Sequence, residues 1–261
     1  MEIGCTCRNK RGNLSLLKSE TIEARAVLFD LFDTLLLIEA DKNVGRICLK
    51  SVYQFLSANG INVSFKDFKR AYYEARTRLY EGTGRELEEP HYRVRISETL
   101  KRLGYEYDPS DPVVSGAAEA YCEEFIRHIH PDEDAYHVLR RLRENGYKIG
   151  VVSNFAIPEC ARKLISLHGL KDFLDVIVIS AEINRRKPSP EIFKFALESL
   201  GVNGVNAIFI GDTPDIDVRG ARYAGMKAIL IERKSMDANA GDKPDFTIKR
   251  LRELLDLLKI K

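Results

Sequence analysis

The stretch that decides the fold is residues 26–34, which read AVLFDLFDT. Four apolar residues follow one another there without alternation, which predicts a short strand buried on both faces, as in a parallel sheet covered by helices. Asp30 and Asp33 come directly after this strand. Ligands of an open parallel sheet bind beyond the carboxyl ends of its strands, so both aspartates are expected in a binding crevice.

Four similar apolar runs occur in the C-terminal half of the chain, at residues 148–152, 175–179, 207–210 and 227–231. Helical patterns alternate with them, at residues 159–168, 190–200, 215–224 and 250–258. A glycine follows each of the first three helical patterns, as is common at helix C-termini. Repeated β-α units of this kind predict an α/β fold with a doubly wound, mostly parallel, Rossmann-like sheet.

Residues 43–130 have a different character from the rest of the chain. They contain no convincing strand pattern, but four amphipathic stretches predict helices at residues 46–57, 66–80, 92–103 and 112–129. The expected organisation is an N-terminal arm at residues 1–24, an α/β core formed by residues 25–42 and 131–261, and an inserted α-helical cap domain at residues 43–130.

Composition excludes several classes of protein. Lysine and arginine total 41 and aspartate and glutamate total 39, so a net charge of +2 gives no electrostatic case for nucleic acid as a partner. No apolar run approaches the ~18 residues of a membrane span, and the polar N-terminus lacks a secretory signal. Five scattered cysteines predict plain thiols in a reducing compartment, without a disulfide framework, and thus a cytoplasmic protein. The single glutamine and three methionines are typical of thermophile proteins.

Polar groups follow the other predicted strands of the core as well. Ser153 and Asn154 come after the second strand, Lys187 lies beyond the third, and Asp212 comes after the fourth. One aspartate after a strand commonly caps a helix or forms a turn, but four strand ends carrying such groups in order predict one shared site. Converging carboxylates repel one another. A hard divalent cation such as Mg²⁺ relieves that repulsion and suits carboxylates combined with a substrate phosphate.

These residues fall in four short motifs, at residues 29–35 (FDLFDTL), 152–154 (VSN), 187–188 (KP) and 211–217 (GDTPDID). Each motif is weak alone, but their set and order resemble the haloacid dehalogenase-like (HAD) hydrolase superfamily, and its phosphatase branch in particular. The resemblance covers the core, about residues 25–40 and 130–261. It implies a helical cap inserted after the first motif.

The resemblance implies a hydrolase of phosphoric monoesters that works through an aspartyl-phosphate intermediate. Asp30 would be the nucleophile, and Asp33 would protonate the leaving alkoxide and then deprotonate the attacking water. Lys187 would supply positive charge where negative charge builds up on the transferring group. The residues expected to bind the substrate phosphate are Thr34, Ser153, Asn154 and Lys187.

The same resemblance implies Mg²⁺ as the cofactor. Its ligands would be Asp30, the backbone carbonyl of Asp33, and Asp212, while Asp217 would orient Lys187 or a metal-bound water. The expected partner is a small phosphorylated metabolite, with no nucleic acid and no membrane, and no pattern specifies an oligomeric state. Three cationic side chains of the cap are the candidates for substrate specificity: Arg85, Arg93 and Arg95.

Other functions on the same scaffold stay open. A 2-haloacid dehalogenase of this superfamily lacks the second aspartate of the first motif, whereas Asp33 is present here. A non-catalytic binding protein would have lost at least one catalytic group, yet Asp30, Lys187 and Asp212 are all present. Mutase and phosphonate-cleaving variants share the core and differ in cap residues.

Overall fold

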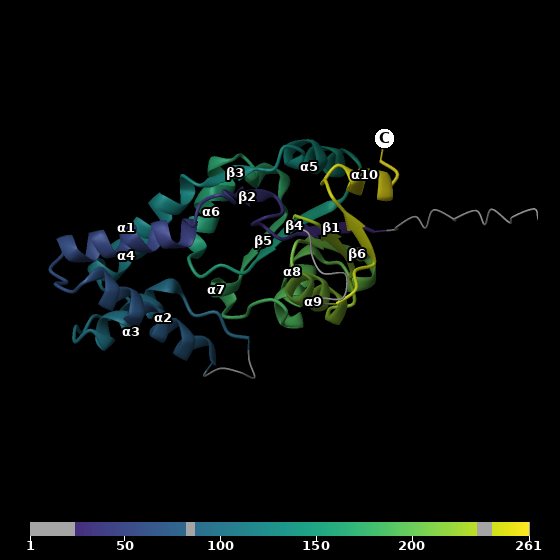
Figure 1. The fold of residues 1–261 in the computed structure, drawn as a ribbon. Coiled ribbons are helices and arrows are strands. Elements are labelled where there is room, and N and C mark those ends of the chain that lie inside the picture. The colour runs from purple at the N-terminus through teal and green to yellow at the C-terminus, as the bar shows by residue number, and fades with distance from the viewer. Residues whose placement is uncertain (1–23, 82–86, 234–241, 261) are drawn as a thin grey trace, which may run out of the picture.

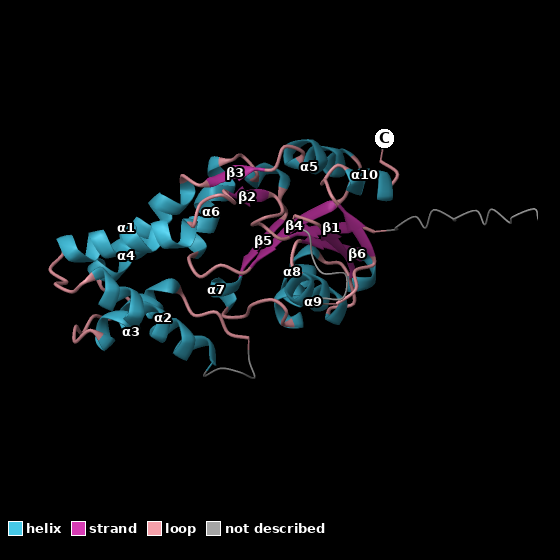
Figure 2. Ribbon diagram, in the orientation of Figure 1, coloured by secondary structure: helices cyan, strands magenta, loops and turns pink. Residues whose placement is uncertain are grey.

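The six strands of the central sheet all run parallel. The structure, a computed structural model, describes residues 24–81, 87–233 and 242–260. The strand order across the sheet is β5-β4-β1-β6-β7-β8, and every neighbouring pair is parallel. Figures 1 and 2 show this sheet as one layer with helices on either side. The strands are β1 (Ala26–Phe29), β4 (Lys148–Ser153), β5 (Val176–Ile179), β6 (Ala207–Gly211), β7 (Lys227–Ile231) and β8 (Phe246–Ile248).

β1 lies in the interior of the sheet, and all four of its residues are fully buried. Ala26 is in register with Lys148 of β4 on one side and with Ala207 of β6 on the other. An uninterrupted apolar run is suited to this position because both faces of the strand are covered. The parallel α/β sheet expected from the sequence is confirmed, and the residue that follows β1 lies between the ends of two neighbouring strands.

Helices cover both faces of the sheet. Val27 and Phe29 belong to one core cluster together with apolar side chains of α5 and α6, whereas Leu28 belongs to a second cluster with those of α8 and α9. Alternation of successive strand side chains between the two faces produces this division. The helices of the core are α5 (Ala135–Glu144), α6 (Pro158–Leu167), α7 (Ser180–Ile183), α8 (Pro190–Leu200), α9 (Arg219–Tyr223) and α10 (Glu253–Leu257).

Between β2 and β3 the described residues form four helices, and we call them the cap. They lie together at one end of the molecule, on the left in Figure 1. Helix α1 packs against α4, and α2 packs against α3. The cap helices are α1 (Val44–Ala58), α2 (Phe65–Glu81), α3 (Tyr92–Arg102) and α4 (Pro112–Ile126). The expected helical insertion is thus confirmed.

Two short strands at the base of the cap differ from the sequence expectation. β2 (Leu36–Ile38) and β3 (Ile129–Pro131) form an antiparallel pair. A helix reaching residue 129 is therefore wrong, because α4 ends at Ile126 and the following chain pairs with β2. Helix α5 and strand β8 are present in the structure but were not predicted from the sequence. The pattern at residues 215–224 forms a π-helix (Pro214–Val218) that continues into α9.

A disulfide joins the cap to the core. Cys122 of α4 and Cys160 of α6 are bonded, with their Cα atoms 5.5 Å apart and a separation of 38 positions in the sequence. The expectation of plain thiols is wrong for this pair, because the packing of two distant helices brings the cysteines together, and sequence spacing does not show that. Cys48 is a buried free thiol. Cys5 and Cys7 lie outside the described residues.

Aromatic side chains fill the contact between the cap and the first motif. The ring of Phe32 lies 5.3 Å from that of Phe125 in α4 and 4.9 Å from that of Phe155 in the core, measured between centroids. The N–H of Tyr92, the first residue of α3, donates to the carbonyl of Ala156 at 2.8 Å. The cap therefore packs directly over the carboxyl ends of β1 and β4.

The remaining expectations on organisation concern membrane spans and the N-terminal arm. Among the residues that the structure describes, no helix combines the length and hydropathy needed to cross a membrane. The predicted arm, residues 1–24, falls almost entirely outside the described residues, as does Arg85.

Candidate active site at the carboxyl ends of the strands

The centre of the candidate site is a buried lysine between two aspartates. Lys187 Nζ lies 2.8 Å from Asp30 Oδ1, just beyond β1, and 2.8 Å from Asp217 Oδ1, in the π-helix after β6. Lys187 and Asp217 are each only 1% exposed. Because parallel strands end at the same edge, three motifs that are far apart in sequence meet at one ammonium group.

The local fold after β6 depends on a glycine. A Cβ atom at Gly211 would lie 2.4 Å from Cγ of Asp217, which is too close for any side chain. The wide π-helical turn brings Asp217 back under the end of the strand, where its Oδ2 accepts a hydrogen bond from Thr213 N–H at 3.0 Å. Glycine at the end of β6 therefore makes room for the carboxylate that holds Lys187.

The single positive charge of Lys187 does not fully compensate the neighbouring carboxylates. Burial is the largest cause that raises the pKa of Asp30, and with the carboxylates of Asp217 and Asp212 it outweighs Lys187, bringing that pKa to about 7. Burial, with Asp217 and Asp33 nearby, likewise raises the pKa of Asp212 to about 6. Burial opposes the charge of Lys187, but Asp217 and Asp30 more than offset it and raise its pKa.

Three carboxylates are close enough to share a metal ion. One ligand oxygen from each of Asp30, Asp212 and Asp217 lies within 4.8 Å of the others. A set of oxygen donors with raised carboxyl pKa values fits a hard divalent cation. Such a cation would supply the positive charge needed to balance these carboxylates. The sequence expectation grouped Asp30 and Asp212 with the carbonyl of Asp33, and placed Asp217 beside Lys187. Asp217 contacts Lys187 as expected, but it also joins the carboxylate cluster.

Asp33 lies in a tight turn that follows β1. Its backbone has a φ of +53°, in the left-handed region that few non-glycine residues adopt. Its N–H donates to the carbonyl of Leu36 at 2.7 Å, and its Oδ1 accepts from the N–H of Ile38 at 3.3 Å. The carbonyl of Asp33 accepts a hydrogen bond from Arg233 Nε at 2.9 Å. The turn is thus held by β2 on one side and by Arg233 on the other.

The residues expected to bind phosphate fall into two groups. Thr34 Oγ1 and Ser153 Oγ are buried and have no hydrogen-bond partner among the described residues, so both hydroxyls are available to a ligand. Asn154 is used differently, since its side chain accepts from Lys187 N–H at 2.7 Å and donates to the Lys187 carbonyl at 2.9 Å. Asn154 therefore fixes the backbone that carries Lys187.

A cavity of about 210 Å³ lies between the cap and the core beside these motifs. Arg95 of α3 and Arg186, which precedes Lys187, both line it, and Asn154 connects it to the catalytic motifs. Arg95 donates to Tyr72 Oη at 3.0 Å, while its buried Nε has no hydrogen-bond partner among the described residues. The other lining residues are Arg76, Tyr80, Glu89, Tyr92, Tyr121, Phe155, Ala156 and Ile157.

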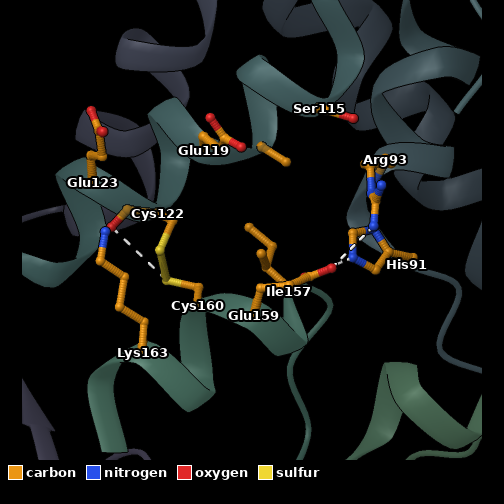
Figure 3. A pocket seen from close by; sticks show the side chains of 11 residues that line it. His91, Arg93, Ser115, Glu119, Cys122, Glu123, Ile157, Glu159, Cys160 and Lys163 are labelled. Carbon is orange, nitrogen blue, oxygen red and sulfur yellow. Dashed lines mark hydrogen bonds and ion pairs between the residues drawn. A yellow bond between two sulfur atoms is a disulfide. The ribbon is translucent and has the colours of Figure 1, made fainter. Parts of the chain in front are cut away.

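A larger cavity, of about 450 Å³, contains none of the motif residues. Figure 3 shows it between α3, α4 and α6, with the Cys122–Cys160 disulfide on one wall. Arg93 and His91 both pair with Glu159 there, at 3.0 Å. Of the two described arginines expected to meet substrate, Arg95 therefore lies beside the motifs, and Arg93 lines the other cavity.

Two arginines of the site have no place in the sequence prediction. Arg186 directly precedes the motif lysine Lys187, and this position is the sequence signal for a place near the site. Arg233 belongs to no motif, and it reaches the Asp33 turn only because β7 lies next to β6 in the sheet.

The fold and the grouped motifs define an HAD-type hydrolase, and comparison with known proteins agrees. The family model for haloacid dehalogenase-like hydrolases matches residues 24–225, so the chain belongs to this family. A glyceraldehyde 3-phosphate phosphatase of Methanopyrus kandleri is 35% identical over 244 residues, which are 90% of this chain and 97% of that protein. The chain is thus a phosphatase-type hydrolase of the HAD family, as the sequence resemblance implied.

Solved structures agree with this assignment. An HAD phosphatase from Thermococcus onnurineus is similar over 91% of this chain and 99% of its own, with a TM-score of 0.64 and 27% identity. A 2-haloacid dehalogenase from Pseudomonas syringae pv. Tomato covers 90% of this chain and 98% of its own, with a TM-score of 0.68 and 24% identity. The second similarity supports the fold alone.

Proposed function

We propose that this protein is a Mg²⁺-dependent phosphatase of a small sugar phosphate, and that it works through an aspartyl-phosphate intermediate. The observation that carries the proposal is the buried Lys187 between Asp30 and Asp217, with Asp212 beside them. The relative from Methanopyrus kandleri, a glyceraldehyde 3-phosphate phosphatase that aligns with nearly the whole chain, supports a three-carbon sugar phosphate as the substrate.

Asp30 is the proposed nucleophile. Its Oδ1 accepts a hydrogen bond from Leu31 N–H at 2.7 Å and forms an ion pair with Lys187 Nζ at 2.8 Å. Because Oδ1 has these two partners, Oδ2 is the oxygen that attacks phosphorus. The new Asp30–phosphorus bond forms as the bond from phosphorus to the ester oxygen breaks. Lys187 and the hydroxyls of Thr34 and Ser153 bind the phosphoryl oxygens, where negative charge increases in the transition state.

Asp33 is the proposed proton carrier. In the first step it donates a proton to the leaving alkoxide, and in the second it removes a proton from the water that attacks the aspartyl-phosphate. That attack releases inorganic phosphate and returns Asp30 to its carboxylate form. Asp30, Asp212 and Asp217, or the carbonyl of Asp33 in place of Asp217, would hold Mg²⁺, which would neutralise charge on the phosphate.

The cavity between the cap and the core is the proposed site for the sugar part of the substrate. Its volume of about 210 Å³ suits a molecule of a few carbon atoms. Arg95 and Arg186 present guanidinium N–H groups there for carbonyl or hydroxyl oxygens of the substrate. Arg93 and Arg85 remain secondary candidates for specificity. The cap is proposed to comprise residues 43–130, and the core residues 25–42 and 131–261.

The test is a panel of phosphate esters assayed with the full-length protein, with Mg²⁺ and after removal of metal with EDTA. We expect phosphate release that depends on Mg²⁺, a preference for glyceraldehyde 3-phosphate over hexose phosphates, and no activity in Asp30→Asn. A parallel assay measures chloride release from 2-chloropropionate. Chloride release in the absence of metal, without phosphatase activity, would favour the dehalogenase function and contradict the proposal.

A further inference from the structure

The Cys122–Cys160 disulfide lies on the boundary between the cap and the core. Cys122 belongs to α4 of the cap, and Cys160 belongs to α6, the core helix that follows Asn154. Figure 3 shows the bond on a wall of the cavity of about 450 Å³, which both cysteines line. Cys122 is 8% exposed and Cys160 is 1% exposed. A thiol that enters the cavity therefore meets the bond most readily at the sulfur of Cys122.

Two backbone hydrogen bonds also join the cap to the core. Tyr92 N–H of the cap donates to the carbonyl of Ala156 at 2.8 Å, and Arg186 N–H of the core donates to the carbonyl of Leu87 at 2.7 Å. Hydrogen bonds of this kind break and re-form in solution when a segment opens locally. A disulfide does not open in this way, because a chemical reaction must break it. The redox state of the two cysteines thus determines whether the cap is covalently tethered to α6.

This tether restricts movement of the cap. The chain passes between the core and the cap beside β2 and β3, which pair with each other, so the cap can turn about this pair. Such a movement requires α4 to separate from α6. A disulfide keeps two Cα atoms within roughly 7 Å, and those of Cys122 and Cys160 are already 5.5 Å apart. The intact bond therefore allows a separation of only about 1–2 Å at this point.

The restriction affects the candidate site because residues of both domains enclose it. The cavity of about 210 Å³ is lined by Tyr92 and Arg95 from the cap and by Asn154 from the core. Phe32 of the first motif also packs against Phe125 of α4. Separation of the two domains would open this cavity to substrate and product, as lid movements commonly do.

We propose that the Cys122–Cys160 disulfide is a redox switch that controls opening of the cap. One thiolate of a dithiol attacks Cys122 Sγ, the disulfide bond breaks, and Cys160 leaves as a thiolate. The second thiolate of the dithiol then attacks the mixed disulfide and releases Cys122. The dithiol becomes a disulfide, and its two electrons and two protons end on the two cysteines. The oxidised protein keeps the cap closed, and the reduced protein lets it open.

The test measures amide hydrogen exchange by NMR at Tyr92 and Arg186, whose N–H groups form the two hydrogen bonds across the boundary. After reduction with dithiothreitol, both amides should exchange at least about 10-fold faster, and by a larger factor than the amides of β4. Cys122→Ser and Cys160→Ser should exchange at the fast rate with or without dithiothreitol. Cys48→Ala is the matched control, because Cys48 is a free thiol and this variant should respond to the reductant as the wild type does.

Unchanged exchange at these two amides after reduction would overturn the switch. An increase no larger than that in β4 would also overturn it, because the bond would then stabilise the whole fold without a specific effect on the cap.

Turnover provides a second readout, which rests on the proposed phosphatase function. Reduction should raise kcat/KM for a three-carbon sugar phosphate about 10-fold, because substrate enters when the cap opens. Cys122→Ser should have the raised value before reduction and should not respond to dithiothreitol. An equal or lower kcat/KM in the reduced wild type would contradict control of access by the bond. Absence of ester hydrolysis in both redox states would overturn the proposed function and leave the exchange result unaffected, so the two failures are distinguishable.

Discussion

The ammonium group of Lys187 and the carboxylate of Asp30 form an ion pair of 2.8 Å in the interior of the protein. The Lys187 side chain is 1% exposed and that of Asp30 14%, so bulk water and mobile ions screen the pair much less than a surface pair. Removal of one partner of a buried pair leaves the other charge without compensation. The contact thus links the stability of the fold to the catalytic centre.

Lys187→Met is expected to abolish phosphatase activity and to lower the free energy of unfolding by about 3–5 kcal/mol. Urea unfolding of the metal-free protein measures the second effect. Lys194→Met is the matched control, because Lys194 is exposed on α8 and its loss should change stability by less than about 0.5 kcal/mol. Equal stability of the two variants would contradict the role of Lys187 in balancing the carboxylates.

Asp33→Asn is expected to slow turnover by about 100- to 10,000-fold for alkyl phosphates, since general acid–base catalysis commonly contributes that much. The effect should be much smaller for p-nitrophenyl phosphate, whose leaving group needs little protonation. Steady-state kinetics on a series of esters with leaving groups of different pKa measures this. A loss of the same size for every ester would exclude Asp33 as the leaving-group acid.

Arg95→Met is expected to lower kcat/KM about 10- to 100-fold for the preferred sugar phosphate and to leave p-nitrophenyl phosphate nearly unaffected. The reason is that Arg95 lines the cavity next to Asn154 and not the centre around Lys187. Arg102→Met is the matched control, because Arg102 belongs to the same helix but pairs with Glu74 and lines neither cavity. A uniform change over the substrate panel in both variants would show that neither arginine determines specificity.

Reduction of the Cys122–Cys160 disulfide is expected to lower the free energy of unfolding by about 2–4 kcal/mol, as for loops of this length. Thermal unfolding with and without a phosphine reductant measures the change. Cys122→Ser serves as the control, since it lacks the bond and its Tm should not respond to the reductant. An equal response of both proteins would mean that the reductant acts elsewhere.

His128 is expected to make stability depend on pH. Hydrogen bonds to Glu39, at 2.6 Å, and to Glu124, at 3.1 Å, raise its pKa above the ordinary value of 6.5. A raised pKa means that the folded protein binds the proton more tightly, so this stabilisation is present below pH 6.5 and is lost as the pH rises through the folded-state pKa. The pKa of Glu39 is lowered by Lys42 and His128, so the carboxylate stays charged in this window.

The measurement for His128 compares Tm values of the wild type and His128→Gln at about pH 5.5 and about pH 8.5. The Tm difference between the two proteins should be larger at the lower pH. His137→Gln is the control, because His137 lies on the exposed face of α5. A Tm difference that does not change with pH would show that His128 does not titrate with these partners.

The parallel core could be predicted from the sequence because its strands are continuous apolar runs. Residues 26–29 and 227–231 match β1 and β7 at both ends, since burial on both faces favours uninterrupted apolar runs such as 26–29 and 228–231. β2 and β3 have only three residues each, too few for a pattern, and they become strands because they pair with each other. Hydrophobic periodicity cannot show such a pairing.

The candidate site could be predicted where its residues end a strand, as Ser153 does, or follow one directly, as Asp30 and Asp212 do. Asn154 has the expected place but a different partner, because its side chain binds the backbone of Lys187. Arg233 is one of 41 basic residues and stands in no motif. Its contact with Asp33 arises from the order of strands in the sheet, which a single sequence does not reveal.

β1 is synthesised early but paired late. Its residues leave the ribosome before the whole cap, yet its two edges pair with β4 and β6, which end at residues 153 and 211. An apolar strand with two unpaired edges is prone to aggregate. Translation must therefore continue for about 180 residues past β1 before both edges are covered. A chain released earlier would leave Asp30 on an exposed segment that is prone to aggregate. Formation of the candidate active site is therefore among the last steps in the synthesis and folding of this protein.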